Sequence, residues 1–256
     1  MIGKCKLCLK EQVELRYSHI LPRWSHKRAR GANSPPVMIS DGKALYSSEQ
    51  IAEYMLCDDC EQLLCHHEKY ASVVSYQSPD DRDARFLDLV GPVVGASDEG
   101  FRIALPGGLD TGALVFFAVS VFWRASVSNL VTSCDCGIKT NESIRRFLLG
   151  EAFPTDATLI VSFVDVPLDS EGHIATMCST PVSEETDGIE IHRFTLFGLW
   201  FCLFVGKSLP GWATSYCAAT TPERYVALAP QTALVDWIGS WAFQARPVGT
   251  LAKQGR

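Results

Sequence analysis

Two pairs of cysteines lie far apart in the chain and share the same spacing. Cys5 and Cys8 enclose Lys-Leu, and Cys57 and Cys60 enclose Asp-Asp. Two thiolates separated by two residues can reach one ion, and two such pairs complete the tetrahedral sulfur shell that zinc prefers. Two disulfides or a redox pair are the alternatives, but neither explains the shared spacing. The sequence therefore predicts a structural zinc site, whose closed shell leaves no position for a substrate.

Basic residues are concentrated at the start of the chain. Residues 1–30 hold eight Lys or Arg against two Glu, although the whole chain has a net charge of -6. A basic segment on an acidic body favours a polyanion as partner. A solvated basic face that binds nothing is the alternative.

A hairpin and a helix are predicted to position the cysteines. Residues 37–46 have a hairpin pattern around an Asp-Gly dipeptide, which tolerates the positive φ angles of a type I′ turn. The stretch from Cys57 to about Val74 is predicted to be a helix, because its first turn is acidic and apolar residues recur at helical spacing. A first CxxC in a tight turn and a second CxxC that opens a helix form the arrangement called a treble clef.

A larger α+β domain is predicted for residues 79–256, with a polar boundary near residue 78. The apolar share of the chain, 47%, excludes wholesale disorder. Mixed helical and strand-like patterns are typical of an α+β fold with an antiparallel sheet. The predicted helices cover 113–130, 141–150 and 232–245, and the predicted strands cover 157–167, 173–180, 189–197 and 199–206. Residues 1–78 are predicted to form a treble-clef module, packed on this domain, in which a metal substitutes for a large core.

Two apolar stretches invite comparison with membrane spans. Residues 112–131 contain Arg124 well inside, and residues 194–206 are too short to cross a bilayer. Both are therefore predicted to be buried core elements, and a buried Arg124 will need an acidic partner. Ten cysteines, two CxxC pairs and no visible signal peptide predict a cytoplasmic protein whose thiols are reduced or bound to metal.

Other cysteines and histidines lie outside these motifs. Cys134 and Cys136 are separated by one residue, a spacing less usual for zinc. They are predicted to be buried small side chains, with a reactive or accessory thiol as the alternative. His173 and His192 lie in strand-like stretches without an obvious Ser or Cys partner for nucleophilic catalysis. No constellation in residues 79–256 indicates a named reaction.

The motifs of residues 5–72 resemble those of zinc-supported HNH, or His-Me finger, endonucleases. CKLC, SHILP, a hairpin and LCDDCEQLL follow the order in which those enzymes carry a first CxxC, a histidine strand and a second CxxC. The spacing is also similar to that of a group of uncharacterised bacterial proteins with SHI-P and LCxxCE motifs. The resemblance implies that His19 is a general base that deprotonates the attacking water. It also implies that Mg²⁺ or Mn²⁺ beside His19 stabilises the charge developing on the phosphodiester.

The resemblance further implies which residues would bind the second ion and the nucleic acid. Ser18 occupies the position where an acidic residue or histidine commonly binds the catalytic ion. The ion ligands are therefore expected from the helix that follows the second CxxC, namely Glu61, His67 or Glu68. Contacts to DNA or RNA phosphates and bases are expected from a basic stretch with an aromatic residue, namely Arg23, Trp24, Lys27, Arg28 and Arg30.

Two functions are consistent with these observations. The first is a metal-dependent, HNH-like nuclease. The alternative is a non-catalytic zinc module that recognises nucleic acid or protein, fused to an α+β sensing or scaffold domain. In this second function, His19 would hydrogen-bond backbone beside the zinc. No membrane partner is expected, and a protein partner or a homo-oligomer is compatible with both functions.

Overall fold

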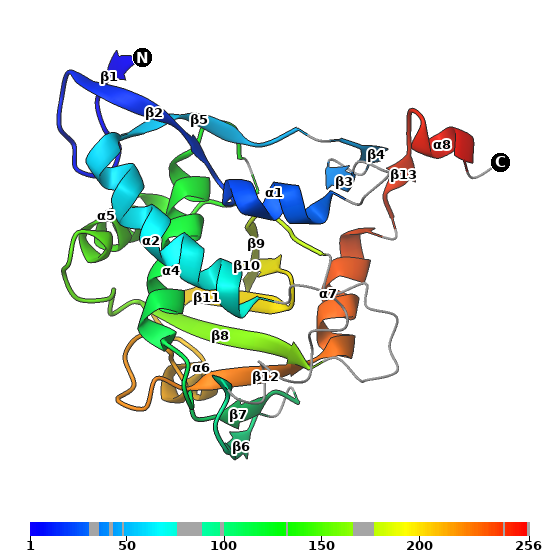
Figure 1. Ribbon diagram of the computed structural model, residues 1–256. Coiled ribbons are helices and arrows are strands. Elements are labelled where there is room, and N and C mark those ends of the chain that lie inside the picture. The colour runs from blue at the N-terminus through cyan, green and yellow to red at the C-terminus, as the bar shows by residue number, and fades with distance from the viewer. Residues whose placement is uncertain are drawn as a thin grey trace.

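The computed structural model describes residues 1–30, 36–40, 43–47, 49–75, 89–97, 100–131, 133–165, 177–242 and 244–254. These residues combine helices with sheets, which confirms the predicted α+β class (Figure 1). None of the described helices is both long enough and apolar enough to cross a bilayer. The expected domain boundary near residue 78 lies outside the described residues and stays a prediction.

The N-terminal part contains a small antiparallel sheet that leads into a helix. Strands β1 (Ile2–Gly3), β2 (Val13–His19) and β5 (Ala52–Cys57) lie in the order β1-β2-β5, and β5 continues directly into helix α2 (Asp58–Val74). Asp58, Asp59 and Glu61 lie in the first turn of α2, where negative charge complements the helix dipole. The helix predicted from about Cys57 is therefore confirmed.

A short helix and a hairpin lie between β2 and β5 in the chain. Helix α1 (Arg23–Ala29) begins after Pro22, and the Ser25 hydroxyl donates to the Pro22 carbonyl (2.8 Å). Strands β3 (Val37–Ser40) and β4 (Lys43–Tyr46) form the predicted hairpin, and residues 41–42 at its turn lie outside the described residues. Strand β13 (Arg246–Pro247) pairs with β4 in parallel and brings the C-terminal segment to the hairpin.

A seven-stranded sheet forms the centre of the larger part. Its order is β6-β7-β12-β8-β11-β10-β9, and each neighbouring pair is antiparallel except β12 with β8. The strands are β6 (Val93–Ala96), β7 (Arg102–Ala104), β12 (Val226–Pro230), β8 (Ala157–Asp165), β11 (Leu199–Val205), β10 (Ile189–Leu196) and β9 (Val182–Thr186). Strands β8, β10 and β11 confirm three predictions.

One predicted strand differs from the structure. Of the expected strand 173–180, residues 173–176 lie outside the described residues, and the rest forms only an isolated bridge between Cys178 and Leu196. The strand beside β10 is instead β9. Its sequence, VSEET, is polar and half exposed, so it lacks the apolar run that would have indicated a strand.

Helices cover both faces of the seven-stranded sheet. Helix α4 (Thr111–Val127) lies on one face, between β8 and α2, and is flanked by α5 (Gly137–Leu148) (Figure 1). Helices α6 (Gly211–Ser215) and α7 (Gln231–Ala242) pack on the other face, and α8 (Leu251–Gln254) lies near β4. The three helices predicted in this part are thus present with shifted ends; α5, for example, begins at Gly137.

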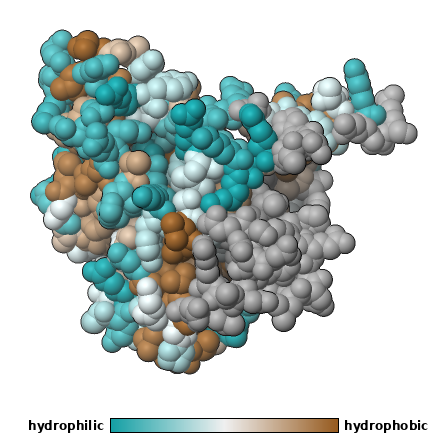
Figure 2. All heavy atoms as spheres, in the orientation of Figure 1, coloured by the Kyte–Doolittle hydropathy of each residue, from teal (hydrophilic) through white to brown (hydrophobic). Residues whose placement is uncertain are grey.

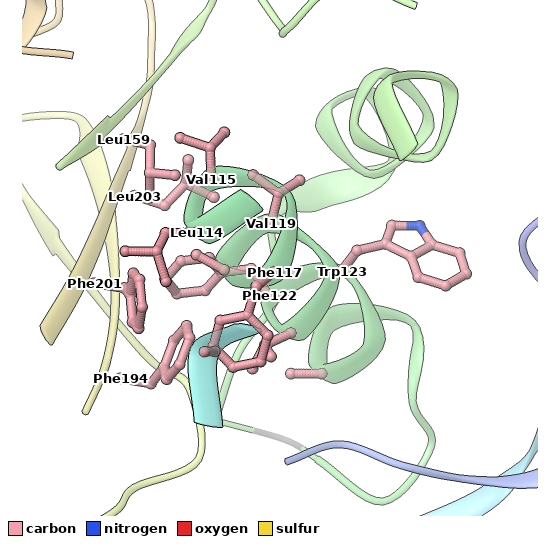
Figure 3. Packing of buried hydrophobic residues seen from close by; sticks show 14 of the residues in the cluster. Leu114, Val115, Phe117, Val119, Phe122, Trp123, Leu159, Phe194, Phe201 and Leu203 are labelled. Carbon is pink, nitrogen blue, oxygen red and sulfur yellow. The ribbon is translucent and has the colours of Figure 1, made fainter. Parts of the chain in front are cut away.

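The main hydrophobic core lies between α4 and the sheet. Phe117 and Phe122 of α4 point toward Phe194 and Phe201, with ring centroids 4.9–6.2 Å apart for the contacting pairs (Figure 3). The same core includes Leu64 of α2, so it extends from the sheet to the N-terminal part. Because α4 is buried on nearly all sides, its apolar sequence reflects a central helix, as predicted.

Candidate metal centre

The four predicted cysteines come together from three elements. Cys5 and Cys8 lie in a tight turn in which the Leu9 N–H donates to the Cys5 carbonyl (3.0 Å). Cys57 ends β5 and Cys60 lies in the first turn of α2. The four sulfur atoms lie within 4.8 Å of one another. The cysteines are therefore close enough to bind one metal ion, in the element order predicted for a treble clef.

The sulfur separations fit a tetrahedral ion better than a disulfide. Cys8 Sγ and Cys57 Sγ lie 3.7 Å apart, and all four cysteines are free thiols. Four sulfurs at about 2.3 Å from a central zinc would lie about 3.8 Å from one another, whereas a disulfide needs about 2.05 Å. The Cys57 N–H also donates to Cys5 Sγ (3.3 Å), which orients that sulfur and stabilises negative charge on it.

The protonation of the cluster is uneven. A hydrogen bond from Cys60 lowers the pKa of the Cys5 thiol to about 4. The same hydrogen bond, together with the burial of Cys60, raises the pKa of the Cys60 thiol. Burial likewise raises the pKa of Cys8. Four closely packed thiolates repel one another, so a cation at their centre is what would let all of them ionise.

The backbone around the first cysteine pair is held by charged side chains from distant elements. Arg145 of α5 donates to the Leu7 carbonyl (2.7 Å). Lys6 donates to the Val127 carbonyl at the end of α4 (2.7 Å) and forms an ion pair with Glu53 of β5. The turn that carries Cys5 and Cys8 is therefore fixed to α4, α5 and β5 by polar contacts.

His19 lies at the end of β2, outside the cysteine cluster. Its strand pairs with β5 so that His19 lies opposite Ala52. Its imidazole is half-buried and lies 6.2 Å from the Tyr17 ring and 6.3 Å from the His26 ring of α1, between centroids. Burial is the main cause that lowers the pKa of His26, and the charge of the nearby His19 lowers it further. These contacts place His19 beside the basic helix α1.

The three expected second-ion ligands already have other contacts. Glu61 accepts a hydrogen bond from the buried Ser18 hydroxyl (2.6 Å). The ring of His67 packs on Phe116 at a centroid distance of 4.1 Å, and burial lowers its pKa. Within the described part of the chain, these residues and His19 do not form a group of three ligands within 4.8 Å.

The remaining expected ligand, Glu68, pairs with a buried arginine. Arg124 of α4 is 1% exposed, and its Nη1 lies 2.7 Å from Glu68 Oε1. The same nitrogen donates to the His19 carbonyl (2.8 Å), and Nε donates to the Ser120 carbonyl (3.3 Å). Arg124 thus has the acidic partner that its burial was predicted to need, and it joins α2, α4 and the end of β2.

The five expected nucleic-acid contacts divide into two groups. Arg23, Lys27 and Arg30 are exposed. Trp24 packs on Phe197 (5.8 Å between centroids), and the guanidinium of Arg28 lies 4.5 Å from the Trp24 ring centre. Arg28 also donates to Ser75 Oγ (2.6 Å) and to the Ser72 carbonyl (3.2 Å). Trp24 and Arg28 therefore attach α1 to the rest of the protein, whereas the other three residues face solvent.

A second group of metal-ligating side chains was not predicted. Cys134, Cys136 and His192 are buried, and their ligand atoms lie within 4.8 Å of one another. The signal in the sequence was weak, because the cysteines are one residue apart and the histidine comes from a distant strand. The one indication in the sequence was His192, an imidazole at a strand position that faces the protein interior, where a polar side chain needs a partner.

Comparisons of this chain with protein-family models, with curated proteins and with solved structures find no match.

Proposed function

We propose that the N-terminal part is a zinc-stabilised module that binds nucleic-acid phosphates through helix α1. Zinc would occupy the Cys5, Cys8, Cys57 and Cys60 cluster as a structural ion, because a four-sulfur shell leaves no open position. In this proposal the metal holds the turn, β5 and the start of α2 together, and α1 makes the contacts with the ligand.

The observation that carries the proposal is a group of three exposed basic residues on α1 and at its C-terminal end. Arg23 and Lys27 are four residues apart in α1, which places them on one side of the helix, and Arg30 is the residue that follows the last residue of α1. A hydrophilic band crosses this face of the molecule at the level of α1 (Figure 2). Three exposed cations so close together in the chain match the repeating negative charge of a phosphate backbone.

The other basic residues of this segment are less suited to the task. They form ion pairs with neighbouring carboxylates: Lys4 with Glu11, Lys6 with Glu53, Lys10 with Asp59 and Arg16 with Asp58. Since these pairs neutralise their positive charges locally, α1 is the better binding surface.

The binding proposal is tested by fluorescence anisotropy with labelled single-stranded DNA, duplex DNA and RNA over a range of salt concentrations. We expect Arg23→Gln/Lys27→Gln to weaken binding and to reduce the salt slope by about 0.9 per lost phosphate contact on duplex DNA. Lys4→Gln/Lys10→Gln, which removes the same charge from paired positions, is the matched control and should change binding less. Equal effects of the two double variants, or no binding by the intact chain, would refute the proposal.

Phosphodiester cleavage is the second candidate function, and the position of His19 favours it. The imidazole lies beside α1, where a bound backbone would pass, and an imidazole suits proton transfer near neutral pH. The spacing of the candidate ion ligands counts against it, because Glu61, His67, Glu68 and His19 do not form a group of three ligands within 4.8 Å of one another in the described part of the chain. Binding without cleavage is therefore the better supported function.

Cleavage is tested with plasmid DNA and RNA in the presence of Mg²⁺ or Mn²⁺. A nuclease that uses His19 loses activity in His19→Ala and keeps it in His66→Ala, which changes an exposed histidine on α2. Binding with no cleavage by the intact chain, or cleavage that survives His19→Ala, would exclude this second function.

A further inference from the structure

The second ligand group lies where the connection from α4 to α5 meets the edge of the seven-stranded sheet. Cys134 and Cys136 are each 2% exposed, and His192 of β10 is fully buried. Their sulfur and nitrogen atoms lie within 4.8 Å of one another, and Cys134 Sγ is 3.9 Å from His192 Nδ1. In a tetrahedral zinc site, a sulfur and an imidazole nitrogen lie about 3.6 Å apart. The separation of Cys134 Sγ from His192 Nδ1 exceeds this value by only a few tenths of an ångström.

Hydrogen bonds of the backbone and of serine hydroxyls hold the loop that carries the two cysteines against the sheet. The Ser183 N–H of β9 donates to the Ser133 carbonyl (2.7 Å), and the Ser133 hydroxyl donates to the Pro181 carbonyl (2.8 Å). On the other side, the Cys136 N–H donates to Ser126 Oγ of α4 (2.8 Å). The loop is thus fixed to both β9 and α4, and its thiols are directed into the space beside His192.

His192 reaches this space because of its position in the strand. Side chains alternate along β10, so His192 shares a sheet face with Phe194, whose ring packs on Phe122 of α4. The His192 ring also lies 6.3 Å from that of Phe122. An imidazole in this apolar layer needs polar partners, because an unpaired buried nitrogen costs about 1–3 kcal/mol.

The two nitrogens of the imidazole have different polar contacts. Nδ1, the nitrogen that faces Cys134, lies 2.6 Å from Ser183 Oγ. Nε2 is buried without a hydrogen-bond partner and lies 3.7 Å from Glu190 Oε2. Metal-bound imidazoles commonly direct their other N–H to a carboxylate. Glu190 is placed to be that outer partner when Nδ1 binds an ion.

The donor atoms of this group favour a particular class of cation. Cys136 directly precedes the first turn of α5, and its sulfur makes no hydrogen bond with the backbone of that turn, so the sulfur is not engaged in capping the helix. Two sulfurs and one imidazole nitrogen form a donor set that selects soft or borderline cations such as zinc over Mg²⁺ or Ca²⁺.

We propose that Cys134, Cys136 and His192 form a second zinc site, distinct from the four-cysteine cluster. Ser183 Oγ hydrogen-bonds to His192 Nδ1 (2.6 Å) and would give up this contact when Nδ1 binds the ion. The site is structural, because its three ligands are buried, and it fastens the α4–α5 connection to β9 and β10. Helix α5 begins at this site and reaches the first cysteine turn through Arg145, so the two ions would fix both ends of α5. This inference does not depend on nucleic-acid binding.

Native mass spectrometry of the full chain, purified with zinc and reductant, tests the site by counting bound ions. We expect two zinc ions per intact chain, one in Cys134→Ser/Cys136→Ser and one in Cys5→Ser/Cys8→Ser. Cys217→Ser changes a buried cysteine outside both groups and should keep two ions. His192→Cys, which supplies another thiolate, should also keep two ions, whereas His192→Phe should keep one.

A readout on the intact chain separates a metal site from a packing role if the serine variant does not fold. Zinc is removed in steps with a chelator, and alkylated cysteines are identified by peptide mapping. We expect Cys134 and Cys136 to become reactive together, in step with the loss of one zinc ion. The proposal is overturned if the intact chain binds one zinc ion that Cys5→Ser/Cys8→Ser removes, or if Cys134 and Cys136 react while two ions stay bound.

Discussion

Glu68→Gln removes the negative partner of a buried arginine and is expected to destabilise the protein strongly. The guanidinium of Arg124 is 1% exposed, and the Glu68 side chain, 2.7 Å away, is 17% exposed. Glutamine keeps the size and one acceptor oxygen but leaves the buried positive charge uncompensated. Loss of one partner of a buried ion pair costs about 3–5 kcal/mol.

The carbonyls that remain around Arg124 place the expected loss near the lower end of this range. The His19 and Ser120 carbonyls still accept from the guanidinium after the substitution. We therefore expect the free energy of unfolding to fall by about 3 kcal/mol, a large share of the about 5–15 kcal/mol typical of a folded domain. The assay is urea unfolding of the zinc-loaded chain, followed by circular dichroism.

Two further variants decide whether burial causes this loss. Glu151→Gln breaks the exposed pair with Arg146 and should cost about 0–1 kcal/mol. Glu68→Gln/Arg124→Met removes both charges and should be more stable than Glu68→Gln alone, because no unpaired charge is left in the interior. If Glu68→Gln costs no more than Glu151→Gln, the buried pair does not join α2 to α4 in the way described.

Three other perturbations test separate parts of the structure. Removal of metal with a chelator should lower the unfolding midpoint of the intact chain sharply, because binding of a structural zinc contributes directly to folding; an unchanged midpoint would contradict this. Asp110→Ala removes the side chain that accepts from the Ala113 N–H at the start of α4 and should lower the free energy of unfolding by about 1 kcal/mol. Asp110→Asn keeps an acceptor oxygen and should lower it much less. Equal losses in the two variants would show that the cap hydrogen bond contributes nothing. Burial raises the pKa of Glu53, but hydrogen bonds from Lys6 and the Asn129 N–H outweigh it and hold this pKa below its ordinary value. The stabilisation by the ionised Glu53 is therefore complete above the unfolded-state pKa of about 4.3 and is lost as pH falls through the folded-state pKa. The difference in free energy of unfolding between wild type and Glu53→Gln, measured by urea unfolding, should shrink below about pH 4. A difference that stays constant across this pH range would contradict the assignment.

The features that local sequence predicted correctly depend on residues close together in the chain. The spacing of the two CxxC pairs, the acidic first turn of α2 and the hairpin of β3 and β4 each follow from a few neighbouring residues. The need of Arg124 for an acidic partner also followed from general physical chemistry. That Glu68 is this partner depends on the packing of α2 on α4, which no local pattern encodes.

The features that were missed depend on tertiary contacts. Helix α1 has only seven residues, and its attachment through Trp24 and Arg28 to Phe197 is a contact between distant segments. The second ligand group needs the pairing of β9 with β10 to carry His192 to Cys134. Strands β6, β7 and β12 are short and gain their hydrogen bonds from partners far away in the sequence.

The most direct test of the four-cysteine metal centre is a proton–cadmium correlation spectrum of the intact chain loaded with ¹¹³Cd. Cadmium substitutes for zinc at sulfur sites, and scalar couplings identify its ligands through their β protons. The centre described here requires one cadmium signal coupled to the β protons of Cys5, Cys8, Cys57 and Cys60. A chain that binds no cadmium, or a signal coupled to fewer of these four cysteines, would contradict it.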